Sequence, residues 1–473
     1  MITKVTTAKN PPVLGKISLE LLVWTAGTII AVFWLVNSAS GDAKTQATIF
    51  AGVLSITFGL RVFLVHGHGR ITVTGLFNLS TAMFIGYAGI IVATGEEYVL
   101  NPHYLGVAVV GGWVAQLGTT ALAWGSNGSQ NIPINLAPRE VANWAAKTGF
   151  FALLAITIAD VAAKDTLGPY TESAAFVAIC VLAVGLLWRA KARIISWSSI
   201  LLAGMFALYA EWFHSGQGRL RIVALACVIG VLYAARFQRR TIKYAIVVLI
   251  PFALAWLAVD RLALQESLNA GGSTGRTGLE SMLSPTVVFA ELLESQAAGF
   301  PIDWGYSLLS FPALFVPSEI WPSQPRALGY DLVAITAPEK VGSGYSVVAS
   351  YTGEAVYNFG MLGFLIVIPV VACLLRFLDK RFVHRLQHAN PTELGLLGIV
   401  FWAMCAGSIA DFTWSGQHTY LARIATRLPL LLGLIILAWV HGSKAENASK
   451  LTVQKQREAR RRAELKSRAF GPV

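Results

Sequence analysis

Apolar runs long enough to cross a membrane recur along the chain and constrain its fold more than any other feature. A helix rises about 1.5 Å per residue and the hydrocarbon core is about 30 Å thick, so about 20 apolar residues cross it. About twelve such runs occur. They are residues 17–37, 46–65, 71–94, 104–124, 147–163, 171–188, 195–213, 220–236, 243–262, 355–375, 391–411 and 425–440. The sequence predicts an all-α polytopic membrane protein.

The composition supports a membrane solvent. Hydrophobic residues make up 55% of the chain and charged residues only 13%, whereas soluble domains carry about 25% charged residues. The first apolar run follows Lys16 without a small-residue cleavage site, so we interpret it as a retained helix rather than a signal peptide. The amino terminus is therefore expected in the cytoplasm.

The basic residues lie where the cytoplasmic loops of such a topology are expected. The net charge of +12 could suggest nucleic-acid binding, but the positive-inside bias explains it better. The basic residues of the even-numbered connections are Arg61, Arg70, Arg139, Arg189, Lys191, Arg193, Arg236, Arg239, Arg240, Lys243, Arg376, Lys380, Arg381 and Arg385. We expect both termini in the cytoplasm of a bacterium and no nucleic-acid partner.

Four parts follow from this topology. Residues 1–262 hold helices one to nine, 263–354 form a long outer loop, 355–443 hold helices ten to twelve, and 444–473 form a basic tail on lipid head groups. Loops of that length are usually functional or disordered. This one is rich in aromatic residues and prolines, so we expect an ordered cap over a cavity.

Neither a nucleotide nor a metal cofactor is predicted. No G-x-x-x-x-G-K-[ST] phosphate cradle occurs in the sequence. His66 and His68 are spaced closely enough to suggest zinc, but Gly67 and Gly69 beside them favour a short polar turn on the cytoplasmic side.

Arginines on the outer side are candidate anion ligands. Arg219 and Arg221 lie in F-H-S-G-Q-G-R-L-R at the start of the eighth run, where glycines allow a tight turn. A guanidinium can hold phosphate oxygens with two hydrogen bonds, although interfacial arginines also reach lipid head groups without further function. The other outward arginines are Arg261, Arg276, Arg326, Arg423 and Arg427. A pyrophosphate would suit a cavity where several of them converge.

Glu354 and Asp411 are two candidate carboxylates on the predicted outer side. Glu354 and Asn358 share one side of the tenth helix because they are four residues apart. Glu354 could act as a base toward a sugar hydroxyl or hold an arginine in place, and Asp411 has the same two interpretations. Trp304, Trp321, Trp414 and Tyr420 could stack on sugar rings, although an interfacial aromatic belt also explains them.

Residues 300–365 resemble the Wzy-type O-antigen polymerases. The resemblance is carried by F-P-I-D-W-G-Y-S, then F-V-P-S-E-I-W-P-S-Q-P, G-S-G-Y-S and G-E-A-V-Y-N-F-G-M-L-G, in this order. It implies a metal-independent glycosyltransferase of the membrane-embedded C class, without a cofactor. Such an enzyme moves the growing glycan from undecaprenyl pyrophosphate onto a fresh lipid-linked repeat unit, outside the cytoplasmic membrane. A chain-length regulator and a flippase would be its further partners.

The resemblance also implies roles for particular residues. Arg219 and Arg276, and more weakly Arg423, would stabilise the departing pyrophosphate. Glu354 would bind or activate the acceptor within the G-E-x-x-x-N-x-G element. The remaining candidate substrate-binding residues are Arg221, Tyr306, Trp321, Gly353, Asn358, Gly360 and Asp411. Ser318 and Gln324 replace basic residues typical of relatives, so no phosphate contact is assigned to them.

Three other functions are weighed against polymerisation. An O-antigen ligase would be expected to carry a catalytic histidine in the long loop, and residues 263–354 contain none. A transporter or flippase of lipid-linked sugars would be expected to show matching halves with interrupted helices, whereas the long loop follows only the ninth run. A polyprenyl-phosphate sugar transferase would need acidic residues in the first outer loop, where only Asp42 occurs.

Overall fold

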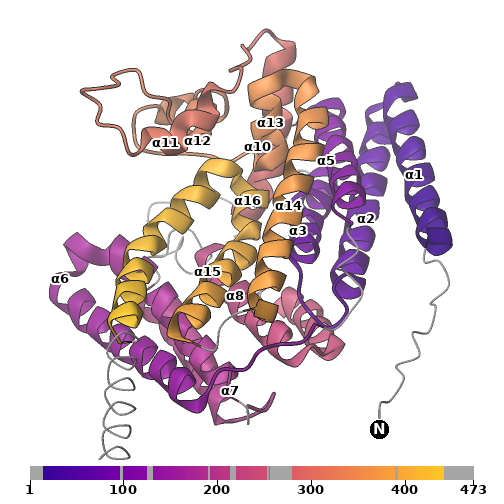
Figure 1. Ribbon diagram of the computed structural model, residues 1–473. Coiled ribbons are helices and arrows are strands. Elements are labelled where there is room, and N and C mark those ends of the chain that lie inside the picture. The colour runs from indigo at the N-terminus through magenta and orange to yellow at the C-terminus, as the bar shows by residue number, and fades with distance from the viewer. Residues whose placement is uncertain are drawn as a thin grey trace, which may run out of the picture. The chain divides into compact units, whose positions relative to one another are not determined.

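The computed structural model describes residues 14–95, 100–124, 132–189, 192–213, 220–252, 255, 280–388 and 392–441. All regular structure in these ranges is helical (Figure 1). The chain divides into two compact units. Unit 1 comprises Met1–Asn131, Arg219–Arg381 and Cys405–Arg423, and unit 2 comprises Ile132–Gly218, Phe382–Met404 and Ile424–Val473.

Ten of the described helical stretches are long and apolar enough to cross a membrane. They are Glu20–Asn37, Gly41–Val65, Val73–Thr94, Pro102–Ala123, Arg139–Ala163, Tyr170–Leu187, Leu220–Phe237, Ser350–His388, Glu393–Ser415 and Gln417–His441. Each overlaps one of the predicted runs, although the bounds of several differ, as for Ser350–His388 against 355–375. The predicted class, an all-α polytopic membrane protein, is therefore confirmed.

The two other predicted runs differ from the rest. Within 195–213, α7 (Trp197–Leu208) is followed at Tyr209 by the π-helical segment η3 (Tyr209–Phe213). Within 243–262, residues 243–252 are helical, and most of the remainder lies outside the described residues. The count of twelve spans therefore stays a prediction.

Unit 1 begins with a bundle of helices. They are α1 (Leu14–Asn37), α2 (Gly41–Val65), α3 (Val73–Thr81), η1 (Ala82–Tyr87), α4 (Ala88–Thr94) and α5 (Pro102–Ala123). Aromatic side chains pack among them, with Trp113 edge-to-face against both Phe58 and Trp24. Polar side chains also join these helices. Ser55 donates to Gln116 at 2.6 Å and Thr120 to Asn78 at 3.0 Å, the kind of buried hydrogen bond that holds membrane helices together.

The rest of unit 1 supplies the long loop and the helices that hold it. Its elements are α8 (Leu220–Phe237), α10 (Glu280–Ala297), η4 (Tyr306–Leu309), α11 (Ser310–Ala313), α12 (Leu328–Thr336), η5 (Pro338–Lys340), α13 (Ser350–Phe359), η6 (Gly360–Leu362), the first part of α14 (Gly363–His388), and α16 (Ile409–Ser415). Helix α10 packs on α5, α4 and α13. The described part of the long loop thus contains several helical elements, whereas an ordered cap over a cavity stays a prediction.

Unit 2 contains α6 (Arg139–Leu187), α7, η3, the end of α14 and most of α15 (Glu393–Gly407). Helix α6 is broken at Ala163, whose φ of −146° and ψ of 40° are not helical. This break separates two crossing stretches at the boundary that the sequence predicts. The helix Gln417–His441, called the C-terminal helix below, starts in unit 1 and continues into unit 2.

The turn at His66–Gly69 is a polar turn, as predicted. Gly67 and His68 have positive φ values of 79° and 55°. The ring of His66 bonds to Thr72 through Nδ1 at 2.8 Å, and the ammonium group of Lys243 donates to the His66 carbonyl at 2.5 Å. This turn therefore joins the ends of helices by hydrogen bonds.

Candidate functional site

The long loop is hydrogen-bonded to the last turn of α13 and to the start of the C-terminal helix. Ser307 donates from Oγ to Oδ1 of Asn358 at 3.0 Å, and Ser310 Oγ lies 2.8 Å from Nδ1 of His418. Asn358 in turn donates to the carbonyl of Glu354 at 2.7 Å. The predicted shared face of Glu354 and Asn358 is thereby confirmed. We call Ser307, Ser310, Glu354, Asn358 and His418 the polar cluster.

The carboxylate of Glu354 caps the C-terminal helix. Its Oε2 accepts the backbone N–H of Gln417 at 2.6 Å, and the backbone N–H of His418 also bonds to it. The first N–H groups of a helix have no partner within the helix and favour negative charge. Glu354 is only 5% exposed, so this contact satisfies polar groups that would otherwise be buried without partners.

Gly416 makes this capping contact possible. Its φ is +81°, a conformation that side chains rarely adopt, and a Cβ there would lie 2.3 Å from Oε2 of Glu354. Only glycine lets the backbone pass so close to the carboxylate while turning into the next helix. The turn between α16 and the C-terminal helix is thus matched to Glu354.

Asp411 holds an arginine, which is one of the two uses predicted for it. Its Oδ1 pairs with Arg423, and the Asp411 side chain is fully buried. Helix α16 carries Asp411 and packs on α13, where Tyr351 stacks against Phe412 with ring centroids 5.7 Å apart. The ion pair and the polar cluster thus lie on elements in direct contact within unit 1.

The loop segment that carries Ser307 and Ser310 is fixed by its own hydrogen bonds. Asp303 donates its backbone N–H to the carbonyl of Tyr357 at 3.1 Å and accepts the Ser307 N–H at 2.5 Å. The hydroxyl of Tyr306 donates to the carbonyl of Ser323, and the ring of Tyr306 meets Trp321 edge-to-face at 6.4 Å. Two predicted substrate-binding aromatics therefore pack against each other.

The two glycines of the G-E-x-x-x-N-x-G element occupy tight positions. A Cβ on Gly353 would lie 2.6 Å from that of Ala349, and one on Gly360 would lie 2.8 Å from Ile302. Gly360 also has a positive φ of 58° and ends α13. Both positions serve close packing, Gly353 in the first turn of α13 and Gly360 at its end.

The predicted arginines are placed in different surroundings. Arg221 lies half-buried in the first turn of α8, Arg326 is exposed, and Arg423 pairs with Asp411. In unit 2, Arg427 is buried over the ring of Phe176 at 3.6 Å. Arg219, Arg261 and Arg276 lie outside the described residues. Their convergence on one cavity therefore stays a prediction.

Sequence reasoning missed Ser307, Ser310 and His418. His418 stands in the outer turn between the last two runs, and its type and position were available signals. Tyr420 shows the opposite outcome, because it is buried and donates to the carbonyl of Cys405 at 3.0 Å. It is therefore part of the core and not available to stack on a sugar.

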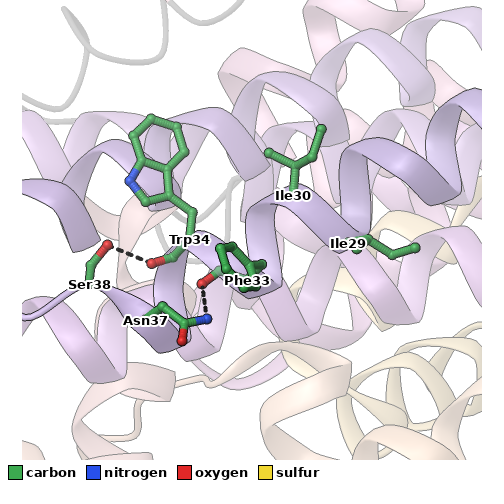
Figure 2. A pocket seen from close by; sticks show the side chains of 6 residues that line it. All are labelled: Ile29, Ile30, Phe33, Trp34, Asn37 and Ser38. Atoms are coloured by element: carbon green, nitrogen blue, oxygen red, sulfur yellow. Dashed lines mark hydrogen bonds between the residues drawn. The ribbon is translucent and has the colours of Figure 1, made fainter.

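One apolar hollow lies apart from these residues. It has a volume of about 420 Å³ and is lined by Ile29, Ile30, Phe33, Trp34, Asn37 and Ser38, on or just after α1 (Figure 2). Asn37 and Ser38 donate to carbonyls of α1 itself, at 2.9 and 2.6 Å. Such an apolar face is what a lipid-facing helix presents.

Comparison with known proteins adds no family. No family model matches the chain, and neither a curated protein nor a solved structure matches it. The chemistry of the site thus has to be argued from its own residues.

Proposed function

We propose that this chain is a glycosyltransferase that polymerises lipid-linked oligosaccharide repeat units, as the Wzy-type polymerases do. The observation that carries the proposal is the attachment of the loop to α13 and the C-terminal helix through Ser307 and Ser310. It gathers a histidine, an amide and two hydroxyls near the ends of membrane helices. A polyprenyl pyrophosphate keeps its chain in the bilayer and its charge at the interface, where such groups can meet it.

In this proposal the cations stabilise the leaving group. Arg219 and Arg276 bind the pyrophosphate of the undecaprenyl carrier as negative charge develops on it. Arg423 is the weaker candidate, since Asp411 neutralises part of its charge. The enzyme lies in the bacterial cytoplasmic membrane, with both termini in the cytoplasm and the site on the outer face.

His418 is a better candidate for the base than Glu354. Oε2 of Glu354 is engaged by backbone N–H groups, and taking a proton would weaken that capping contact. His418 is half-buried, and Ser310 holds its Nδ1, which leaves Nε2 as the second ring nitrogen. A histidine oriented in this way suits proton transfer from an acceptor hydroxyl.

The contact between Ser310 and His418 favours an O-antigen ligase as the second candidate function. The absence of a histidine from residues 263–354 counts against a ligase. Through Ser310, however, the loop acquires a histidine from the next outer turn. A ligase and a polymerase would share the lipid-linked donor and differ in the acceptor.

Deleting the gene in its host separates these functions. We would compare the surface glycan and the lipid extract of the deletion strain with those of a complemented strain on a size-resolving gel. A ladder that collapses to single repeat units supports the polymerase. Full-length polymer trapped on its lipid carrier supports the ligase, and an unchanged ladder contradicts both.

Point variants then test the assigned residues. Arg219→Ala and Arg276→Ala should abolish polymer at a normal protein level, because a missing pyrophosphate contact affects the transition state more than the fold. Lys340→Ala is the control, since Lys340 is an exposed cation of the long loop whose ammonium group lies 4.5 Å from the ring centre of Tyr345. Normal polymer from both arginine variants would refute their roles.

A further inference from the structure

Residues 304–321 of the long loop expose an unusual number of large apolar side chains. Trp304 is 74% exposed, Phe315 69% and Ile320 75%, with Leu314 at 60%. Single exposed apolar residues are ordinary, but a contiguous group marks an interaction surface. Phe311 and Phe315 meet edge-to-face at 5.5 Å, so the segment is compact. We call residues 304–321 the apolar lip.

The charges around the apolar lip narrow the choice of partner. Residues 300–325 contain no lysine or arginine, and their only acids are Asp303 and Glu319. Asp303 is already engaged by the Ser307 N–H. A surface that is aliphatic and aromatic, without basic residues, fits the boundary between acyl chains and head groups better than a charged partner.

Hydrogen bonds join the apolar lip to α13 and to the start of the C-terminal helix. Ser307 bonds to Asn358, which lies five residues before the apolar start of α14 at Gly363. Ser310 bonds to His418, the second residue of the membrane-crossing C-terminal helix. The ends of crossing helices lie at the interface. In Figure 1, α11 lies at the same end of unit 1 as α13, in agreement with these contacts.

The backbone of Trp304 adds an independent observation. Its φ is +54°, which is rare for a bulky residue, and Gly305 follows with a φ of +88°. Strain of this kind persists where the surroundings or a function require it. Here it turns a large indole away from the protein at the tip of a fixed turn. Tryptophan is the residue that most favours the head-group region.

We propose that the apolar lip is seated in the membrane interface, with Leu314, Phe315 and Ile320 in the acyl boundary and Trp304 among the head groups. The partner is the lipid leaflet itself. This seat does not depend on the proposed function. If that function holds, the seat keeps Ser307 and Ser310 at the depth of a lipid-linked pyrophosphate.

Fluorescence quenching in vesicles tests whether the apolar lip lies in the membrane interface. Phe315→Cys and Ile320→Cys would each be made in a chain whose four native cysteines are replaced, then labelled with the environment-sensitive dye NBD. The full-length protein is reconstituted into vesicles of phosphatidylethanolamine and phosphatidylglycerol. Val341→Cys is the matched control, because Val341 is 61% exposed on the same loop beside Glu339 and Lys340.

The proposal predicts opposite quenching at the two places. Labels at 315 and 320 should emit at shorter wavelength and be quenched by lipids with a shallow doxyl group, whereas the label at 341 should be quenched by aqueous iodide. Equal iodide quenching at all three positions would overturn the proposal. Protection of 315 and 320 from both quenchers would overturn it too, since a protein would then cover the lip.

Discussion

The carboxylate of Glu354 accepts the backbone N–H of Gln417 at 2.6 Å, across 63 residues of sequence. A residue that resembles a catalytic acid in the sequence thus completes the hydrogen bonding of a helix start. The same contact fixes the position of His418 relative to α13. Catalytic and structural interpretations of Glu354 can therefore be separated by substitutions that keep or remove an acceptor oxygen.

Glu354→Ala should destabilise the protein more than Glu354→Gln. Alanine leaves the N–H groups of the half-buried Gln417 and His418 without their acceptor, and an unsatisfied donor costs about 1–3 kcal/mol when it is buried. Glutamine keeps one acceptor oxygen and should lose less. Thermal unfolding in detergent measures the difference, and equal losses would contradict the capping role. Full polymer from Glu354→Gln would exclude Glu354 as a general base.

Gly416→Ala should also weaken the contact between the Glu354 carboxylate and the Gln417 N–H. The added Cβ would lie 2.3 Å from Oε2 of Glu354, in a backbone conformation unfavourable for alanine. Gly433→Ala is the control, since no atom lies within 4 Å of a Cβ there and the residue is within the C-terminal helix. We expect a lower unfolding temperature for the first variant only. A harmless Gly416→Ala would show that the turn adjusts freely.

Asp411 and Arg423 should behave as a coupled pair. Removing one partner leaves a buried charge without compensation, which costs about 3–5 kcal/mol. Asp411→Asn and Arg423→Gln are therefore each expected to lower the unfolding temperature clearly. The double variant should be less destabilised than the two single effects added together. Strict additivity would mean that the pair contributes nothing beyond its separate residues.

Glu291 should make stability depend on pH. Burial, followed by repulsion from Glu294, raises its pKa from 4.5 to about 7. The folded state thus holds the proton more tightly than the unfolded state, so the stabilisation is complete below pH 4.5 and is lost as the pH rises toward 7. Glu291→Gln should flatten this part of the stability profile. If the free energy of unfolding of this variant kept the same slope between pH 4.5 and 7, the pH dependence would come from other groups.

The crossing helices were predictable because their signal is local. A run of about 20 apolar residues satisfies the bilayer on its own, and ten predicted runs are present as helices long and apolar enough to cross it. The end of the fifth run at Ala163 was also predictable, because the apolar residues stop there. The π-helical segment that begins at Tyr209 was not, because such a segment depends on packing that composition does not reveal.

The contacts within the polar cluster could be predicted from the sequence only where the residues are close in the chain. The repeat of the helix was enough to place Asn358 beside Glu354, whose carbonyl it contacts. No pattern indicated that Ser307 would meet Asn358 across 51 residues, or Ser310 meet His418 across 108. Residues so far apart in the chain become hydrogen-bond partners only through the packing of the helices, which the sequence pattern does not specify.

The sequence by itself determined the solvent of this protein and the helices that cross it, because hydrophobic length and composition act within each segment. Only the tertiary structure decided that Glu354 caps a helix, that Asp411 holds Arg423 and that the loop obtains His418 through Ser310. Each of these contacts satisfies a buried polar group, and its partner is fixed by the way the helices pack.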